Sequence, residues 1–146
     1  MKHPPMSPAL IASILAVTAN AWGQSALAPS VAMGRADYKD RCASCHGAQG
    51  QGDGPLQSLL VRPAANLTTI AQRHGGRFPH AQVQEMIDGR WLGDSGPHGS
   101  REMPVWGQRF RDQAMDQPDD SPRTAERAAR HRVASLTRYL ESIQVP

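Results

Sequence analysis

Two cysteines and a histidine form the most chemically distinctive cluster in this sequence. Two residues separate Cys42 from Cys45, and His46 follows directly in the stretch CASCH. The 146-residue chain has no other cysteine. Two thiols and an imidazole this close together can form a disulfide, act as a dithiol redox pair, bind zinc, or attach and ligate a haem.

The rest of the sequence favours haem attachment over the other three. A disulfide that closes so short a loop would constrain the unfolded chain little. A thioredoxin-like pair needs a βαβ setting, and no strand-like alternation lies near the motif. Zinc usually takes four ligands, and no second CxxC or HxxxH pair is present. In Cys-x-x-Cys-His, both thiols can add to the vinyl groups of one porphyrin, and the histidine then lies under the iron.

The segment after the motif is rich in glycine, with Gly47, Gly50, Gly52 and Gly54. A residue without Cβ can adopt positive φ and pass close to a ligand edge. We expect this segment to wrap the His46 side of the haem. It should also offer a backbone carbonyl to the second ring nitrogen of His46, with Pro55 helping to hold that carbonyl.

Composition indicates one small domain and excludes some functions. Aromatic residues make up only 5% of the chain, which is few for its core, and 13 glycines and 12 prolines indicate many loops. Such a chain can complete its core with a cofactor. The formal net charge is +3, but no run of Lys or Arg alternates with aromatic residues, so nucleic-acid binding is not supported.

The N-terminal residues have the pattern of an export signal. Lys2 and His3 precede an apolar run at 9–17, which is shorter than the roughly 20 apolar residues that span a bilayer. Ala19-Asn20-Ala21 is a small-x-small cleavage pattern. We therefore predict a signal peptide at 1–21, with cleavage as late as Gly23, and a periplasmic domain at 22–146 without a transmembrane segment. The alternative is an uncleaved membrane anchor.

Periodicity predicts an all-α fold around the motif. Residues 29–47 predict a helix that ends in the attachment motif. A short helix capped by Asn66 is expected within 63–76, and another within 78–89 that ends at Gly89. The stretch 90–110 has neither a helical nor a strand period, and 111–122 is expected to be an acidic loop.

The longest predicted helix is the last one, capped by Ser121 and begun by Pro122. Its apolar stripe has a spacing of three or four residues throughout: Ala125, Ala129, Val133, Leu136, Leu140 and Ile143. Arginines are expected on its other sides: Arg123, Arg127, Arg130, Arg132 and Arg138.

The motifs of this sequence, and the order in which they follow one another, resemble those of class I c-type cytochromes, which are small proteins with one haem. The resemblance covers nearly all of the mature chain and is carried by CASCH with GAQGQGDGP, PAANLT, FPHAQVQEMIDGR, MPVWG and LTRYLESI. It implies about four or five helices wrapped around one covalently attached haem c, with the first and last helices crossing. At that crossing, Gly34 and Tyr38 would meet Leu136, Tyr139 and Leu140. The tail between Phe110 and Ser121 is longer and more acidic than in the shortest family members.

The resemblance also implies that Met103, in REMPVWG, is the second axial ligand opposite His46. A thioether is soft and suits ferrous iron, so His/Met ligation raises the reduction potential. His98 is the main rival, and an open sixth position is a further alternative. The other methionines are assigned to a helix before the motif, an apolar stripe and the acidic loop, in the order Met33, Met86 and Met115.

The sequence therefore predicts a one-electron carrier of the periplasm that is not an enzyme in its own right. Its partners are expected to be redox proteins, including a membrane-bound oxidase or dehydrogenase. The alternatives are a haem c subunit of a larger oxidase or dehydrogenase complex and a haem-based gas sensor. Candidate partners of the haem propionates are Arg62, Arg73, Arg77, Trp91 and Arg101.

Overall fold

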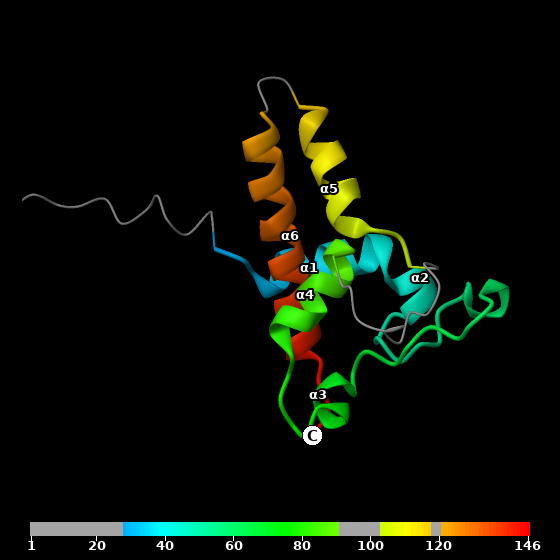
Figure 1. The fold of residues 1–146 in the computed structure, drawn as a ribbon. Helices are drawn as coiled ribbons and strands as arrows, with labels where there is room; N and C mark the ends of the chain where they lie inside the picture. Colours follow the sequence, from blue (N-terminus) through cyan, green and yellow to red (C-terminus); the bar gives the residue numbers. More distant parts are fainter. Residues whose placement is uncertain (1–27, 91–102, 118–120) are drawn as a thin grey trace, which may run out of the picture.

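The fold is built of helices joined by irregular segments (Figure 1). The computed structural model describes residues 28–90, 103–117 and 121–146. This part of the chain has no strand, and its helices are α1 (Val31–Arg41), α2 (Ala43–His46), the 3-10 helix η2 (Gln57–Leu59), α3 (Ile70–Arg73), α4 (His80–Asp88), α5 (Trp106–Met115) and α6 (Pro122–Ser142). The all-α prediction is confirmed. The six α-helices of the described residues exceed the four or five expected, because α2 and α3 are single turns of four residues.

The crossing of α1 and α6 lies at the centre of the fold (Figure 1). A Cβ at Gly34 would lie 2.0 Å from the carbonyl oxygen of Ser135, so only glycine fits there. Tyr38 and Tyr139 pack beside this contact, with ring centroids 5.1 Å apart and ring planes tilted by 49°. The predicted crossing of the first and last helices is therefore confirmed.

Helix α6 begins and packs as its sequence predicts. The Ser121 hydroxyl accepts a hydrogen bond from the Thr124 amide, and the Thr124 hydroxyl accepts one from the Ser121 amide, which completes a capping box. Pro122 occupies the first turn, where its missing N–H costs nothing. The predicted stripe is buried from Ala125 to Leu140 and ends at the half-buried Ile143.

The acidic loop predicted at 111–122 is wrong over its first half, because Arg111–Met115 continues helix α5. This helix runs alongside α6 (Figure 1). Its buried face is short and consists of Trp106, Gly107 and Phe110. The Arg132 guanidinium lies 3.9 Å from the centroid of the Phe110 ring and also bonds Asp37, so Arg132 is packed between helices. The apolar stripe of α5 is narrow and most of its other residues are polar, so the sequence pattern did not predict this helix.

The helix predicted within 63–76 is shorter than expected. It begins at Ile70, and Asn66 does not cap it. The Asn66 side chain instead accepts a hydrogen bond of 2.8 Å from the Thr68 amide and closes a turn before the helix. Helix α4 follows the prediction and ends at Gly89, which has the left-handed φ of 82°.

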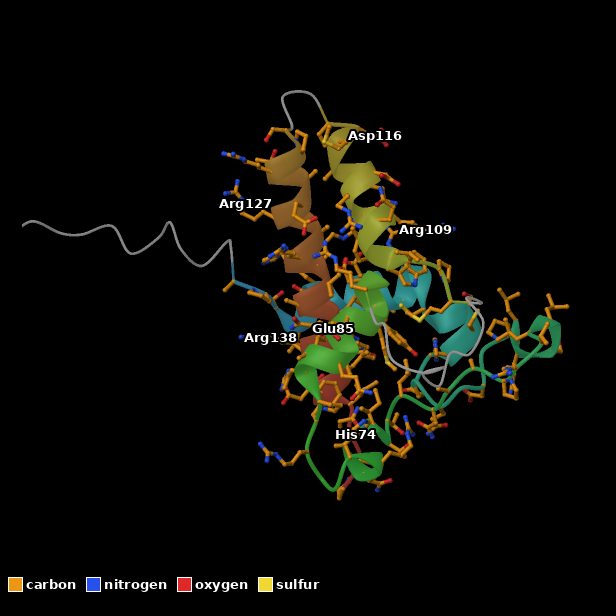
Figure 2. All side chains as sticks on the ribbon, viewed as in Figure 1. His74, Glu85, Arg109, Asp116, Arg127 and Arg138 are labelled. Carbon is orange, nitrogen blue, oxygen red and sulfur yellow. The ribbon has the colours of Figure 1, made fainter. Side chains whose placement is uncertain are left out.

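The other arginines predicted on α6 differ from Arg132 in their surroundings. Arg130 bonds Glu126 one turn earlier on the helix. Arg127 and Arg138 are exposed and point away from α5 (Figure 2). Arg123 is also exposed. A basic face of α6 is therefore present, but it is smaller than the sequence suggested.

Candidate haem site

The CASCH motif occupies the corner between α1 and α2. Helix α1 ends at Arg41, and the Cys42 carbonyl accepts hydrogen bonds from the amides of Cys45 (3.1 Å) and His46 (2.9 Å). This single turn brings the three side chains of the motif to one hollow. Both cysteines are free and half-buried.

The surroundings of Cys42 argue against a dithiol redox site. Burial, together with the negative charge of Asp37, raises the pKa of the Cys42 thiol to about 12. A redox-active cysteine needs the opposite shift, because the thiolate is the nucleophile. The thiol is therefore in an apolar setting that suits attachment to a large apolar group.

An apolar cavity of about 310 Å³ lies beside the motif. Its wall includes three of the four predicted site residues, Cys42, His46 and Met103. Segments 65–74, α4 and α6 supply the rest: Ala65, Leu67, Ile70, Arg73, His74, Pro79, Gln82, Val83, Met86, Ile87, Leu136 and Leu140, with Tyr38 of α1. The fourth site residue, Cys45, lines a smaller hollow of about 70 Å³ that shares Cys42, His46 and Met103 with the cavity. The structure thus brings all four predicted residues together.

His46 is held in one orientation by the backbone. Its side chain is buried, and Nδ1 lies 2.9 Å from the carbonyl oxygen of Ala65. Because a carbonyl only accepts, Nδ1 carries the proton in the neutral ring and Nε2 carries the lone pair. Burial lowers the pKa of His46 and so favours this neutral, ligand-competent form.

The prediction that a backbone carbonyl bonds the His46 ring is correct, but the predicted residue that supplies this carbonyl is wrong. Pro55 is exposed, and the acceptor is Ala65, well beyond the glycine-rich segment. The return of the chain to the motif depends on Gly52, whose φ is 85° and whose Cβ would lie 2.5 Å from the Ala64 carbonyl oxygen. The Gly52 amide also donates to the His46 carbonyl, at 2.8 Å. The glycine therefore links the motif to the segment that orients its histidine.

Two other glycines also bring the chain close to the motif. A Cβ at Gly54 would lie 2.5 Å from the backbone of both Ser44 and Cys45. Gly47 has a φ of 82°, and its carbonyl accepts a 2.6 Å hydrogen bond from the buried Tyr38 hydroxyl. The glycine-rich segment therefore packs closely against the motif at these positions, and its wrapping of the haem stays a prediction.

The methionines differ in their relation to the cavity. Met103 lies just before α5, is half-buried, and lines both hollows. Met86 lines only the larger cavity and is half-buried on α4, so it belongs to the cavity wall as well as to the apolar stripe. Met33 and Met115 are exposed. The rival ligand His98 lies outside the described residues, and the ligand role of Met103 stays a prediction.

Comparison with known families identifies the fold and the motif together. The family model for cytochrome c matches residues 31–117. The chain belongs to the cytochrome c family. Comparisons with curated proteins and with solved structures found no match. Cytochrome c proteins bind haem covalently and transfer electrons, and domains of this family generally lie outside the cytoplasm.

The site of this cytochrome fits a covalently bound haem c. The two free cysteines suit two thioether bonds, and the neutral tautomer of His46 suits an iron ligand. The neighbouring cavity is lined mainly by apolar side chains, as a porphyrin requires. In the part of the cytochrome that the structure describes, no helix has the length and apolar character needed to cross a membrane.

Polar groups at the rim of the cavity could meet the carboxylates of the haem. Of the predicted propionate partners, Arg73 lines the cavity and Arg62 lines the smaller hollow, whereas Arg77 lines neither. Trp91 and Arg101 lie outside the described residues. Sequence reasoning missed His74, which lines the cavity and whose Nδ1 lies 2.8 Å from the Ile70 carbonyl oxygen. The available signal for His74 in the sequence was its position four residues, or one helical turn, after the apolar Ile70.

Proposed function

We propose that this cytochrome is a one-electron carrier of the periplasm whose haem iron is ligated by His46 and Met103. The observation that carries the proposal is that Met103 lines the same two hollows as Cys42 and His46. An imidazole and a thioether at one cavity form the ligand pair of a haem that transfers electrons. Redox proteins, either soluble or membrane-bound, are its proposed partners.

Each residue of the site has a distinct part in this function. The bound haem supplies the change between Fe(II) and Fe(III). Cys42 and Cys45 hold the group in place, and the Ala65 carbonyl fixes the ring of His46. The soft sulfur of Met103 stabilises the reduced state. The apolar wall excludes water and thereby lowers the local dielectric around the iron.

The basic side of α6 is a proposed region for partner encounter. Arg127 and Arg138 are exposed there and point into solvent (Figure 2). Charges of one sign raise the rate at which an oppositely charged partner arrives. This proposal predicts that electron transfer to an acidic partner slows as ionic strength rises.

Binding of carbon monoxide to the reduced protein tests the ligand pair. A carrier with Met103 on the iron should bind CO weakly, because the sixth position is taken. Met103→Ala should open that position and bind CO readily, whereas Met86→Leu should behave like the wild type. A wild-type protein that binds CO as readily as Met103→Ala would contradict the carrier and favour the gas sensor.

A further inference from the structure

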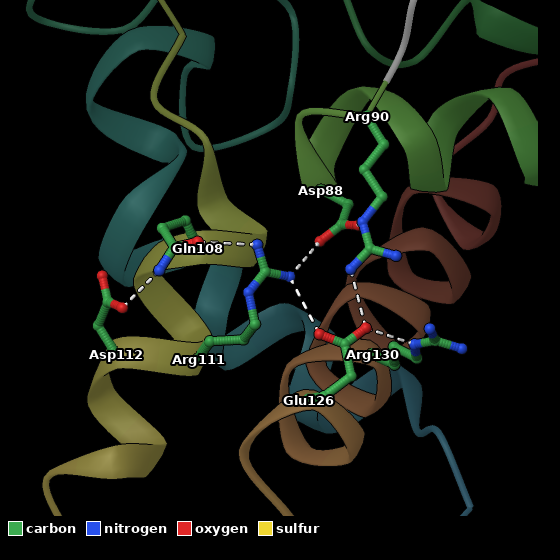
Figure 3. Close-up of polar contacts among 7 residues, drawn as sticks. All are labelled: Asp88, Arg90, Gln108, Arg111, Asp112, Glu126 and Arg130. Carbon is green, nitrogen blue, oxygen red and sulfur yellow. Dashed lines mark hydrogen bonds and ion pairs between the residues drawn. The ribbon is translucent and has the colours of Figure 1, made fainter. Parts of the chain in front are cut away.

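A cluster of four charged residues joins α4, α5 and α6 (Figure 3). We call Asp88, Arg90, Arg111 and Glu126 the Arg111 cluster. Arg111 Nη1 lies 3.3 Å from Asp88 Oδ1 and 3.3 Å from Glu126 Oε2. Arg90 bonds the same two carboxylates, Asp88 through Nε and Glu126 through Nη2 at 2.8 Å. Two arginines and two carboxylates thus connect three helices.

The charges of this cluster are partly withdrawn from solvent. The side chains of Asp88 and Arg111 are only 13% and 22% exposed. Hydrogen bonds from Arg130 and Arg90 lower the pKa of the Glu126 carboxyl to about 2. Glu126 therefore stays ionised at neutral pH, and the half-buried pair of Asp88 and Arg111 is screened less than a surface pair.

Tight backbone packing accompanies the ion pairs. A Cβ at Gly107 would lie 1.6 Å from Asp88 Oδ1, and one at Gly89 would lie 2.4 Å from Val105 Cγ1. Gly89 and Arg90 follow the end of α4, and the amides of both donate hydrogen bonds of 2.9 Å to the Glu85 carbonyl. The end of α4 and the start of α5 are therefore closely packed against each other.

This junction lies next to Met103 along the chain. Met103 is followed by Pro104 and Val105, and Val105 contacts Gly89 at the junction. Arg111 lies one turn after Gly107 on α5 and fixes the helix against α4 and α6. The position from which Met103 enters the cavity therefore depends on how firmly α5 is held.

We propose that Arg111 is a positioning residue for Met103, acting through the Arg111 cluster to hold α5 where the thioether reaches the iron. This proposal rests on the proposed function, because it assumes that Met103 is the axial ligand. Loosening the cluster should let an external ligand displace Met103 more easily, even when the haem and His46 are unchanged.

Imidazole titration of the oxidised holoprotein tests this proposal. Arg111→Met should tighten imidazole binding about tenfold, a change of about 1.4 kcal/mol. Arg130→Met is the matched control, because Arg130 also bonds Glu126 and carries the same charge. It belongs to α6 itself and, among the described residues, forms no ion pair with another helix. It should bind imidazole with nearly the wild-type affinity. Arg111→Lys should lie between wild type and Arg111→Met, because lysine keeps the charge and loses the planar fork.

A double-mutant cycle separates positioning from general loosening. In a Met103→Ala background imidazole meets no sulfur competitor, so adding Arg111→Met should no longer change its affinity. Two outcomes would overturn the positioning role and still leave Met103 as the ligand. In the first, Arg111→Met changes the imidazole affinity equally in the wild-type and Met103→Ala backgrounds. In the second, Arg111→Met and Arg130→Met change that affinity equally. If Met103→Ala alone left imidazole affinity unchanged, the proposed ligation would fail, and with it the premise of the positioning role.

Discussion

The two sides of the cavity are held by different kinds of interaction. On the His46 side, the contacts are made by backbone: the Ala65 carbonyl meets the imidazole, and Gly52 lies against the Ala64 carbonyl. On the Met103 side, the junction of α4 and α5 is held by side-chain ion pairs centred on Arg111. One proposed axial ligand is thus held by local chain geometry, and we propose that the other is positioned by charges from three helices.

This difference has a physical consequence for the two ligands. Close-packed backbone contacts are stiff, because the backbone has no side-chain torsion through which it could move out of contact. Ion pairs of partly exposed side chains are weaker and depend on salt and pH. We therefore expect the His46 side to stay intact under conditions that loosen the Met103 side. The following predictions test that expectation, from the largest effect to the smallest.

Removing both attachment points should have the largest effect, because both sides pack around the same group. In Cys42→Ser with Cys45→Ser, haem should become extractable by acid and organic solvent, and the apo chain should be largely unfolded by circular dichroism. Binding of a group to the folded state alone stabilises that state, and its loss removes the stabilisation. Haem that remained through the extraction would contradict thioether attachment.

Gly52→Ala should disturb the His46 side selectively. A methyl group there would collide with the Ala64 carbonyl at 2.5 Å, and overpacking typically costs about 1–3 kcal/mol. Gly75→Ala is the control, because Gly75 also has positive φ, at 64°, but has nothing within 4 Å of the added Cβ. The free energy of unfolding should fall more for Gly52→Ala than for Gly75→Ala. Equal losses of unfolding free energy in the two variants would show that the destabilisation comes from backbone strain alone and not from contact with the Ala64 segment.

Acid should weaken the Met103 side through Glu126, and this effect is the smallest. The folded-state pKa of Glu126, about 2, lies below the ordinary value of 4.5. Its contribution to stability is therefore present above pH 4.5 and is lost as pH falls toward 2. Glu126→Gln should cost about 0.2–1 kcal/mol near pH 6, as exposed ion pairs do, and the difference from wild type should shrink toward pH 2. A difference that stayed constant with pH would assign the effect to packing.

The same contrast explains what the sequence could predict. CASCH and the capped stripe of α6 are local patterns with a direct physical meaning. The family match supports a haem motif in the first, and the structure confirms the helix in the second. The crossing at Gly34 was expected from the resemblance to class I c-type cytochromes. Its physical reason is that a glycine within a helix is costly unless a partner backbone approaches.

Features that depend on distant residues were missed. Ala65 has no side-chain chemistry that marks its carbonyl as the partner of His46. The buried face of α5 consists of Trp106, Gly107 and Phe110 alone, and its polar surface resembles a loop. The bonds of Arg111 to Asp88 and Glu126 join three helices, and no spacing within one helix reveals them.

The central claim is that Met103 is the iron ligand on the weaker side, and the reduction potential tests it most directly. Potentiometric titration should be carried out on the wild type, Met103→Ala and the control Met86→Leu, which keeps a side chain of similar volume in the cavity wall. For one electron, a tenfold change in the relative stability of the two oxidation states shifts the potential by about 59 mV. We predict that Met103→Ala lowers the potential by at least about this amount, while Met86→Leu stays close to the wild type. An unchanged potential in Met103→Ala, or an equal fall in Met86→Leu, would contradict the account.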